Sequence, residues 1–139
     1  MADYSIRTEI DRPYDEAVAA ARAALASEGF GVLTEIDVKA TMKKKLDKDF
    51  RPYIILGACN PPNAFKSLTA ELEIGLFLPC NVIVYETEPG KSVVAAIDPA
   101  VMMQPVGNEE LAPVADEIGG RLRRAIEAVG SIDTVVADS

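Results

Sequence analysis

Two Cys-Asn pairs, Cys59-Asn60 and Cys80-Asn81, carry the most distinctive chemistry of this sequence. The first pair is followed by Pro61, which is typical of a helix start, with the asparagine as cap and the proline as first helical residue. A thiol just before such a cap lies near unpaired N–H groups and the positive end of the helix dipole, which stabilise a thiolate. Cys59 is therefore a candidate catalytic nucleophile, ligand or redox sensor. The alternative is a small apolar side chain that closes a strand.

The cysteines leave some kinds of site open, and the missing histidine excludes others. Cys80 follows Pro79 at the expected start of a strand, so both thiols can lie at one end of a sheet and form a redox pair, although their spacing is not Cys-x-x-Cys. The absence of histidine excludes Ser-His-Asp and Cys-His catalysis. A zinc ion would have to be bound by two thiolates together with Asp or Glu, which is an unusual set of ligands. We therefore expect no bound metal. The sequence identifies no cofactor, and both an enzyme and a protein without catalytic activity are compatible with it.

Charged residues supply further candidates for a binding site. Glu35 and Asp98 lie near expected strand ends, where a carboxylate can act as an acid or base or can simply be solvated. Lys45 belongs to a cluster of cations that can hold an anion or form a solvated face. This cluster consists of Lys39, Lys43, Lys44, Lys45, Lys48 and Arg51. The full set of candidate ligand-binding residues is Cys59, Asn60, Cys80, Asn81, Glu35, Lys45 and Asp98.

The elements that position these residues follow from the spacing of apolar side chains. Strand-like patterns predict strands over residues 4–10, 30–37, 53–58, 81–86 and 92–97, the last two joined by a turn at 88–91. Helical spacing predicts helices from Pro13 to a C-terminal Gly29, over 38–46, from Pro61 with an apolar stripe of Phe65, Leu68 and Leu72, and over 111–129. The sequence therefore predicts an α+β fold, in which a sheet of about five strands carries its long helices on one face.

Composition and charge indicate one domain and argue against some classes of binding partner. A chain of 139 residues, 49% of them hydrophobic and 26% charged, is typical of a single globular domain, here 1–139 with 130–139 as a frayed tail. A formal charge of −8 argues against a nucleic acid partner. The sequence shows no secretory signal and no apolar window of membrane length, which indicates a cytoplasmic protein with free thiols and no membrane partner.

The order of several motifs resembles a known family. Residues 29–46, 55–61, 74–86 and 97–99 are similar to the uncharacterised prokaryotic domain-of-unknown-function family three hundred and two, and the Cys-Asn-Pro and Pro-Cys-Asn motifs are its signature. The resemblance covers most of the chain. It implies an α+β fold similar to the TATA-binding-protein-like class, with an antiparallel sheet and long helices, and it implies a homodimer. It implies no reaction and supplies no catalytic residues.

Three functions are compatible with these observations. The first, which we favour because no catalytic set is recognisable, is a small-molecule or anion binding or sensing module whose pocket lies near the two Cys-Asn motifs. The second is a thiol-dependent enzyme or redox carrier that uses Cys59. The third is a dimeric scaffold in which the cysteines only pack.

Overall fold

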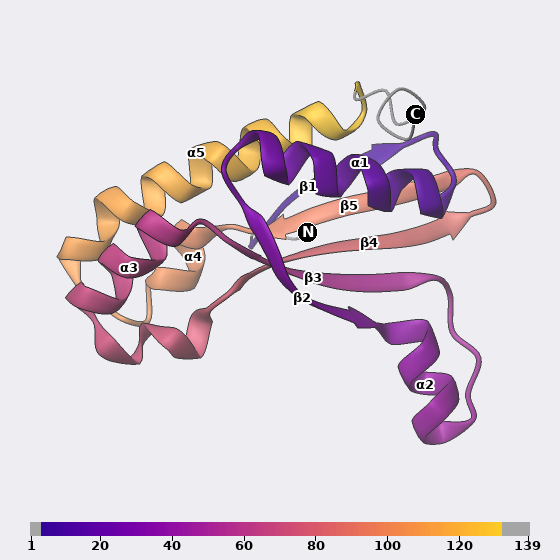
Figure 1. Cartoon of the computed structure of the whole chain (residues 1–139), viewed down its shortest axis with the longest axis horizontal. Helices are drawn as coiled ribbons and strands as arrows, with labels where there is room; N and C mark the ends of the chain where they lie inside the picture. The colour runs from indigo at the N-terminus through magenta and orange to yellow at the C-terminus, as the bar shows by residue number, and fades with distance from the viewer. Residues whose placement is uncertain (1–3, 132–139) are drawn as a thin grey trace.

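The computed structural model describes residues 4–131, which form one sheet and a set of helices (Figure 1). The strands are β1 (Ser5–Ile10), β2 (Gly31–Asp37), β3 (Tyr53–Cys59), β4 (Cys80–Glu88) and β5 (Lys91–Ile97). The α-helices are α1 (Tyr14–Ser27), α2 (Val38–Leu46), α3 (Pro61–Ala70), α4 (Pro99–Met103) and α5 (Ala112–Val129). The short 3₁₀ helices are η1 (Leu72–Phe77) and η2 (Glu109–Leu111). The strand order is β1-β5-β4-β3-β2, and every neighbouring pair is antiparallel.

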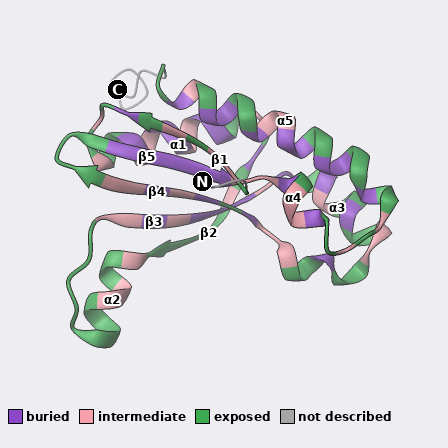
Figure 2. Cartoon of the chain, turned by 180° about the vertical axis from the view of Figure 1, so that it is seen from behind, coloured by how far each residue is buried: buried purple, intermediate pink, exposed green. Residues whose placement is uncertain are grey.

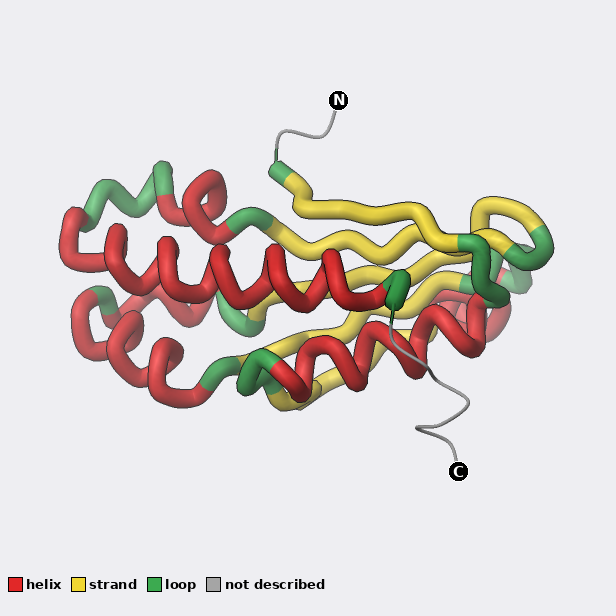
Figure 3. The backbone as a smooth tube through the Cα atoms, turned by 90° about the horizontal axis from the view of Figure 1, so that it is seen from above, coloured by secondary structure: helices red, strands yellow, loops and turns green. Residues whose placement is uncertain are grey.

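The main core lies between one face of the sheet and the helices α1 and α5 (Figure 1, Figure 3). Alternation along a strand turns every second side chain to this face. The three inner strands contribute Ile54, Leu56, Ala58, Cys80, Val82, Val84, Val94 and Ala96. The helices contribute Ala17, Ala20, Ala21, Ala24 and Leu25 from α1, and Val114, Ile118, Leu122, Ala125, Ile126 and Val129 from α5. The alanines of α1 let that helix approach the sheet closely.

A second, smaller core closes one end of the sheet. Here η1, α4, η2 and the start of α5 enclose Ile74, Met103, Leu111 and Ala115. Both Cys-Asn motifs lie at this end, because the first ends β3 and the second begins β4. At the other end α2 follows β2 and projects on the side of the sheet opposite α1 and α5 (Figure 1).

The predicted α+β fold, with an antiparallel sheet of five strands and its long helices on one face, is confirmed. The bounds predicted for α2 agree with the structure, and those of the strands agree within one or two residues. Gly29 has a φ of 84°, the left-handed conformation that a helix-ending glycine supplies. Residues 132–139 of the expected frayed tail lie outside the described residues.

The apolar stripe predicted on the third helix does not face the core. The helix ends where Glu71 adopts an extended conformation, with a φ of −147°, so Leu72 belongs to η1 instead. The buried side of α3 is polar: Asn63 and Ser67 face inward, and the Ser67 hydroxyl donates to the Asn63 carbonyl at 2.9 Å. Phe65 is 73% exposed and Leu72 is 83% exposed. The stripe is therefore an apolar surface of the protomer.

Candidate functional site

The first Cys-Asn motif ends β3, and its asparagine is a structural connector. The Asn60 side-chain oxygen caps α3 by accepting from the Asn63 backbone N–H at 3.3 Å and from the Asn63 amide at 3.0 Å. The Asn60 amide nitrogen donates to the Gly29 carbonyl oxygen at 3.2 Å, which ties α3 to the connection between α1 and β2. Asn60 is 8% exposed and both polar atoms of its side chain are bonded, so little remains for a ligand.

Cys59 lacks the helix N-terminal donors that the sequence argument assumed. The first two helical residues, 61–62, are prolines and carry no N–H. The N–H groups of Asn63 and Ala64 donate to the side chain and to the carbonyl oxygen of Asn60. Residues 61–64 therefore offer no free N–H group to a thiolate at Cys59. Of the two stabilising effects that the sequence suggested, only the helix dipole remains.

The second motif begins β4, and its cysteine belongs to the main core. Cys80 is 4% exposed and pairs with Ala58 in the ladder between β3 and β4. Burial raises the pKa of the Cys80 thiol to about 11, with a smaller contribution from nearby Cys59. Both thiols are free. Because successive residues of a strand face opposite sides, Cys59 points away from the side that Ala58 and Cys80 share.

Asn81, the second residue of this motif, is exposed, and its side chain has no hydrogen-bond partner among the residues described. It lines a cavity of about 490 Å³, which we call the Asn81 cavity. The other lining residues are Leu76, Phe77, Leu78, Pro79, Ile97, Val101, Met102 and Pro105. A smaller hollow of about 170 Å³ shares Asn81 and Ile97 and is also lined by Tyr4, Ser5, Ile83, Ala95 and Ala96. An unpaired amide thus stands where two apolar hollows meet.

A close packing contact at Gly57 positions the wall of the Asn81 cavity. Gly57 pairs with Asn81 in the β3–β4 ladder. A Cβ atom on Gly57 would lie 2.2 Å from Thr34 Oγ1 and 2.7 Å from Pro79 Cγ. Glycine therefore leaves room for Thr34 and Pro79 to pack onto β3. The sequence analysis missed this residue, and the signal that identifies it is a glycine inside an otherwise apolar strand.

The charged candidates have partners of their own or lie elsewhere. The Glu35 carboxylate pairs with Arg22 on α1. One Asp98 oxygen accepts a backbone N–H of α4 at 3.0 Å, and the other accepts from Arg123 at 3.1 Å. Lys45 is exposed in the last turn of α2. The structure brings Asp98 to the end of the sheet that carries both Cys-Asn motifs, and it places Glu35 in the middle of β2 and Lys45 beyond the other end.

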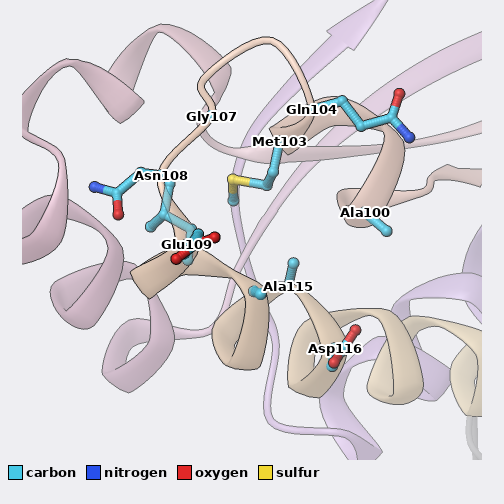
Figure 4. Close-up of a pocket in the computed structure, with 10 residues that line it drawn as sticks. Ala100, Met103, Gln104, Gly107, Asn108, Glu109, Ala115 and Asp116 are labelled. Carbon is cyan, nitrogen blue, oxygen red and sulfur yellow. The ribbon is translucent and has the colours of Figure 1, made fainter.

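Two further hollows flank α5. One of about 300 Å³ lies between α4, η2 and the start of α5, with Met103 and Ala115 in its wall and Glu109 and Asp116 on its exposed rim (Figure 4). The other, of about 470 Å³, is lined by Asn60, Pro62, Asn63, Lys66, Pro113, Val114, Glu117 and Arg121. Arg121 is already bound, to the Glu117 carboxylate and to the Glu28 carbonyl oxygen. The charged residues Glu109, Asp116 and Lys66 of these hollows are exposed, and Arg121 is paired.

Metal and membrane-spanning sites are not found in the described part of the chain. Within residues 4–131, the His, Cys, Asp and Glu side chains form no group of three that could hold a metal ion. Over the same residues, no helix has both the length and the hydropathy needed to cross a membrane.

Comparisons with known proteins confirm the family that the motifs predicted. The model of the family described as "Domain of unknown function DUF302" matches residues 6–129. The crystal structure of an uncharacterized conserved DUF302 protein from Bacillus stearothermophilus is similar to this chain, with 29% sequence identity and a TM-score of 0.82. The similarity covers 91% of this chain and 98% of that one. No curated protein matches the chain. The chain therefore belongs to the DUF302 family of domains of unknown function.

Proposed function

We propose that this protein is a binding or sensing module that holds a small, largely apolar molecule in the Asn81 cavity. One observation carries this proposal: an exposed amide, unpaired among the residues described, stands where two apolar hollows meet. The larger hollow, of about 490 Å³, falls within the range of roughly 300–1,000 Å³ that small-molecule sites occupy.

The lining of the Asn81 cavity defines the chemistry of the ligand. All the lining residues are uncharged and most are apolar, so removal of apolar surface from water supplies the binding free energy. The Asn81 amide offers an acceptor oxygen and two N–H donors, which suits a carbonyl, hydroxyl or carboxamide group. Met102 adds a flexible, polarizable wall. A neutral molecule with one polar group fits this cavity better than an anion, because the lysine cluster lies beyond the other end of the sheet.

A thiol-dependent reaction has less support. Neither cysteine lines the Asn81 cavity or the smaller hollow that shares Asn81 and Ile97 with it. The buried Cys80, with its raised pKa, is a protonated thiol at neutral pH, and the thiol form is not the nucleophile. Cys59 lacks the N–H donors that favoured it in the sequence. These observations favour binding over catalysis.

Titration with N-phenyl-1-naphthylamine, a neutral fluorescent molecule with one N–H, tests the proposal. We expect saturable binding to the wild type, and a loss of at least tenfold in affinity for Val101→Trp, which fills the cavity. Asn81→Ala removes one hydrogen bond of about 1 kcal/mol, which corresponds to about fivefold in affinity. Leu33→Trp is the matched control, because Leu33 is exposed on β2 and outside the cavity. Absence of saturable binding, or equal affinity of the wild type and Val101→Trp, would contradict the proposal.

A further inference from the structure

Helix α3 lies beside α5 at the end of the sheet that carries both Cys-Asn motifs (Figure 1, Figure 3). Each of these helices buries one side and exposes the other (Figure 2). A cavity of about 470 Å³ runs between them, and we call it the α3–α5 cleft. It is lined by α3 with its cap and by α5, through Asn60, Pro62, Asn63, Lys66, Pro113, Val114, Glu117 and Arg121. The volume lies within the range of small-molecule sites, roughly 300–1,000 Å³.

The order of polar groups along the cleft follows from the contacts at Gly29. A Cβ atom on Gly29 would lie 3.0 Å from Asn60 Nδ2 and 3.4 Å from Arg121 Nη1, so these two side chains share one end of the cleft. One helical turn away from this end come Asn63 on α3 and Glu117 on α5. Both line the cavity, and they therefore occupy its middle from opposite sides.

A series of hydrogen bonds fixes the direction of the Asn63 amide. The Gly29 carbonyl can only accept, so the Asn60 amide nitrogen faces it at 3.2 Å and the Asn60 side-chain oxygen faces α3. That oxygen accepts from the Asn63 backbone N–H at 3.3 Å and from the Asn63 amide nitrogen at 3.0 Å. The side-chain oxygen of Asn63 is thereby turned away from Asn60.

This Asn63 oxygen accepts no hydrogen bond from any residue described, although Asn63 is only 5% exposed. A buried acceptor without a donor is destabilising, and such groups are rare in folded proteins. Because Asn63 lines the cleft, a molecule bound there can supply the donor. The Glu117 carboxylate, whose partner among the described residues is Arg121, is a second acceptor. The middle of the cleft therefore favours a positively charged group with several N–H donors.

Lys66 supplies the opposite charge at the far end of the cleft. It follows Asn63 by one turn of α3 and is exposed, and it forms no ion pair or hydrogen bond with the residues described. Arg121, the other cation, is bonded to Glu117 and to the Glu28 carbonyl oxygen. A single unpaired cation suits a carboxylate better than a phosphate dianion, because the chain carries a formal charge of −8.

We propose that the α3–α5 cleft binds a free α-amino acid with a small apolar side chain. The ammonium group of the ligand donates to the Asn63 oxygen and to the Glu117 carboxylate, and its carboxylate accepts from Lys66. The apolar walls, Pro62 and Val114, contact the side chain of the ligand. Since a zwitterion has no net charge, the acidic surface of the chain does not repel it.

Isothermal titration calorimetry of the full chain with L-alanine, L-valine and L-leucine tests this site. We expect saturable binding of L-valine at one site per chain. N-acetyl-L-valine lacks the ammonium group and L-valinamide lacks the carboxylate, so each should bind about tenfold more weakly than L-valine. Absence of saturable binding by all three amino acids would overturn the proposal, and so would equal affinity for L-valine and N-acetyl-L-valine.

Two substitutions assign each charged group of the ligand to a residue. Lys66→Met should weaken the binding of L-valine about tenfold and leave that of L-valinamide unchanged, because this ligand has no carboxylate. Glu117→Gln should weaken the binding of L-valine about fivefold and leave that of N-acetyl-L-valine unchanged. Both residues are exposed, so the variants should keep the wild-type circular dichroism spectrum. Lys45→Met is the matched control: it removes the same charge from an exposed position outside the cleft and should bind L-valine as the wild type does.

Val101→Trp separates this site from the proposed function, on which it does not rest. The substitution fills the Asn81 cavity, which shares no lining residue with the α3–α5 cleft, so the affinity for L-valine should not change. Either proposal can therefore fail without the other. Equal losses for L-valine and L-valinamide in Lys66→Met would overturn the assignment of the carboxylate. Tight binding of inorganic phosphate that is lost in Lys66→Met would assign the cleft to an anion and overturn the proposal.

Discussion

The two Cys-Asn motifs contain the same residue types in opposite environments. In the first, Asn60 is buried with both polar atoms bonded, and Cys59 is partly exposed. In the second, Cys80 is buried in the core and Asn81 is exposed at a cavity. The difference arises from the strand ends: the first motif ends β3, where the chain enters a helix and needs a cap. The second begins β4, where alternation turns Cys80 to the core and Asn81 to the opposite face of the sheet.

The comparison shows that backbone position, rather than residue type, decides which motif is available to a ligand. The side chain of Asn60 is used by the fold, while that of Asn81 is free among the residues described. Changes in the first asparagine should therefore reduce stability, and changes in the second should reduce binding. Each of the following experiments tests one side of this contrast.

The largest effect is expected for Asn60→Ala. Loss of the helix cap contributes about 1 kcal/mol, and the buried Asn63 amide left without its partner contributes about 2 kcal/mol more. We expect the free energy of unfolding, measured by urea denaturation, to fall by roughly 3 kcal/mol.

Asn81→Ala is the matched control for this experiment. Because its side chain is exposed, the free energy of unfolding should stay within about 0.5 kcal/mol of the wild type. Equal losses in the two variants would show that both asparagines are structural, and the contrast between the motifs would then fail.

Much of the fold could be predicted from sequence because apolar spacing records which side of an element is buried. The strands and α2 were found in this way, and the helix start at Asn60-Pro61 was correct because capping is a local interaction. The orientation of α3 could not be found from spacing. Its polar side faces inward where Asn60, which caps the helix, also donates to the Gly29 carbonyl oxygen, and this tertiary contact joins residues 31 positions apart.

The candidate site was only partly predictable for the same reason. Asn81 was identified from its motif, but the cavity it lines depends on η1 and α4, which are distant in sequence and meet at the end of the sheet. The assumption that Cys59 lies among free N–H groups was wrong, because residues 61–62 are prolines and the N–H groups of Asn63 and Ala64 donate to Asn60. The charged candidates were chosen as strand-end residues, whereas their partners Arg22 and Arg123 come from helices.

A smaller loss of stability is expected for the cysteines. Here the residue of the second motif should matter more, whereas among the asparagines it is the residue of the first motif. Cys80→Ser places a hydroxyl group in the apolar core, which should lower the free energy of unfolding by about 2 kcal/mol. Cys59→Ser is the control, with an expected loss below about 0.5 kcal/mol because the side chain is partly exposed. Urea denaturation at neutral pH under reducing conditions measures both. If Cys59→Ser were the more destabilised variant, Cys59 rather than Cys80 would be the packing cysteine.

The smallest effect is a pH dependence that should belong to Cys80. Burial, with a smaller effect of Cys59, raises the pKa of Cys80 from 9.0 to about 11. Above pH 9 the unfolded chain therefore releases this proton while the folded chain keeps it, so stability falls as pH rises from 9 toward 11. At pH 10 the loss should be about 1 kcal/mol.

The difference in free energy of unfolding between the wild type and Cys80→Ala isolates this titration, because the raised tyrosine pKa values of Tyr14 and Tyr53 are common to both proteins. This difference should be constant below pH 8. By pH 10 the wild type should have lost about 1 kcal/mol of stability relative to Cys80→Ala. Cys59→Ala should keep most of the wild-type pH dependence, because the part of the shift due to burial remains. A difference that does not change between pH 8 and pH 10 would mean that Cys80 is reached by water, and the two cysteines would then have the same environment.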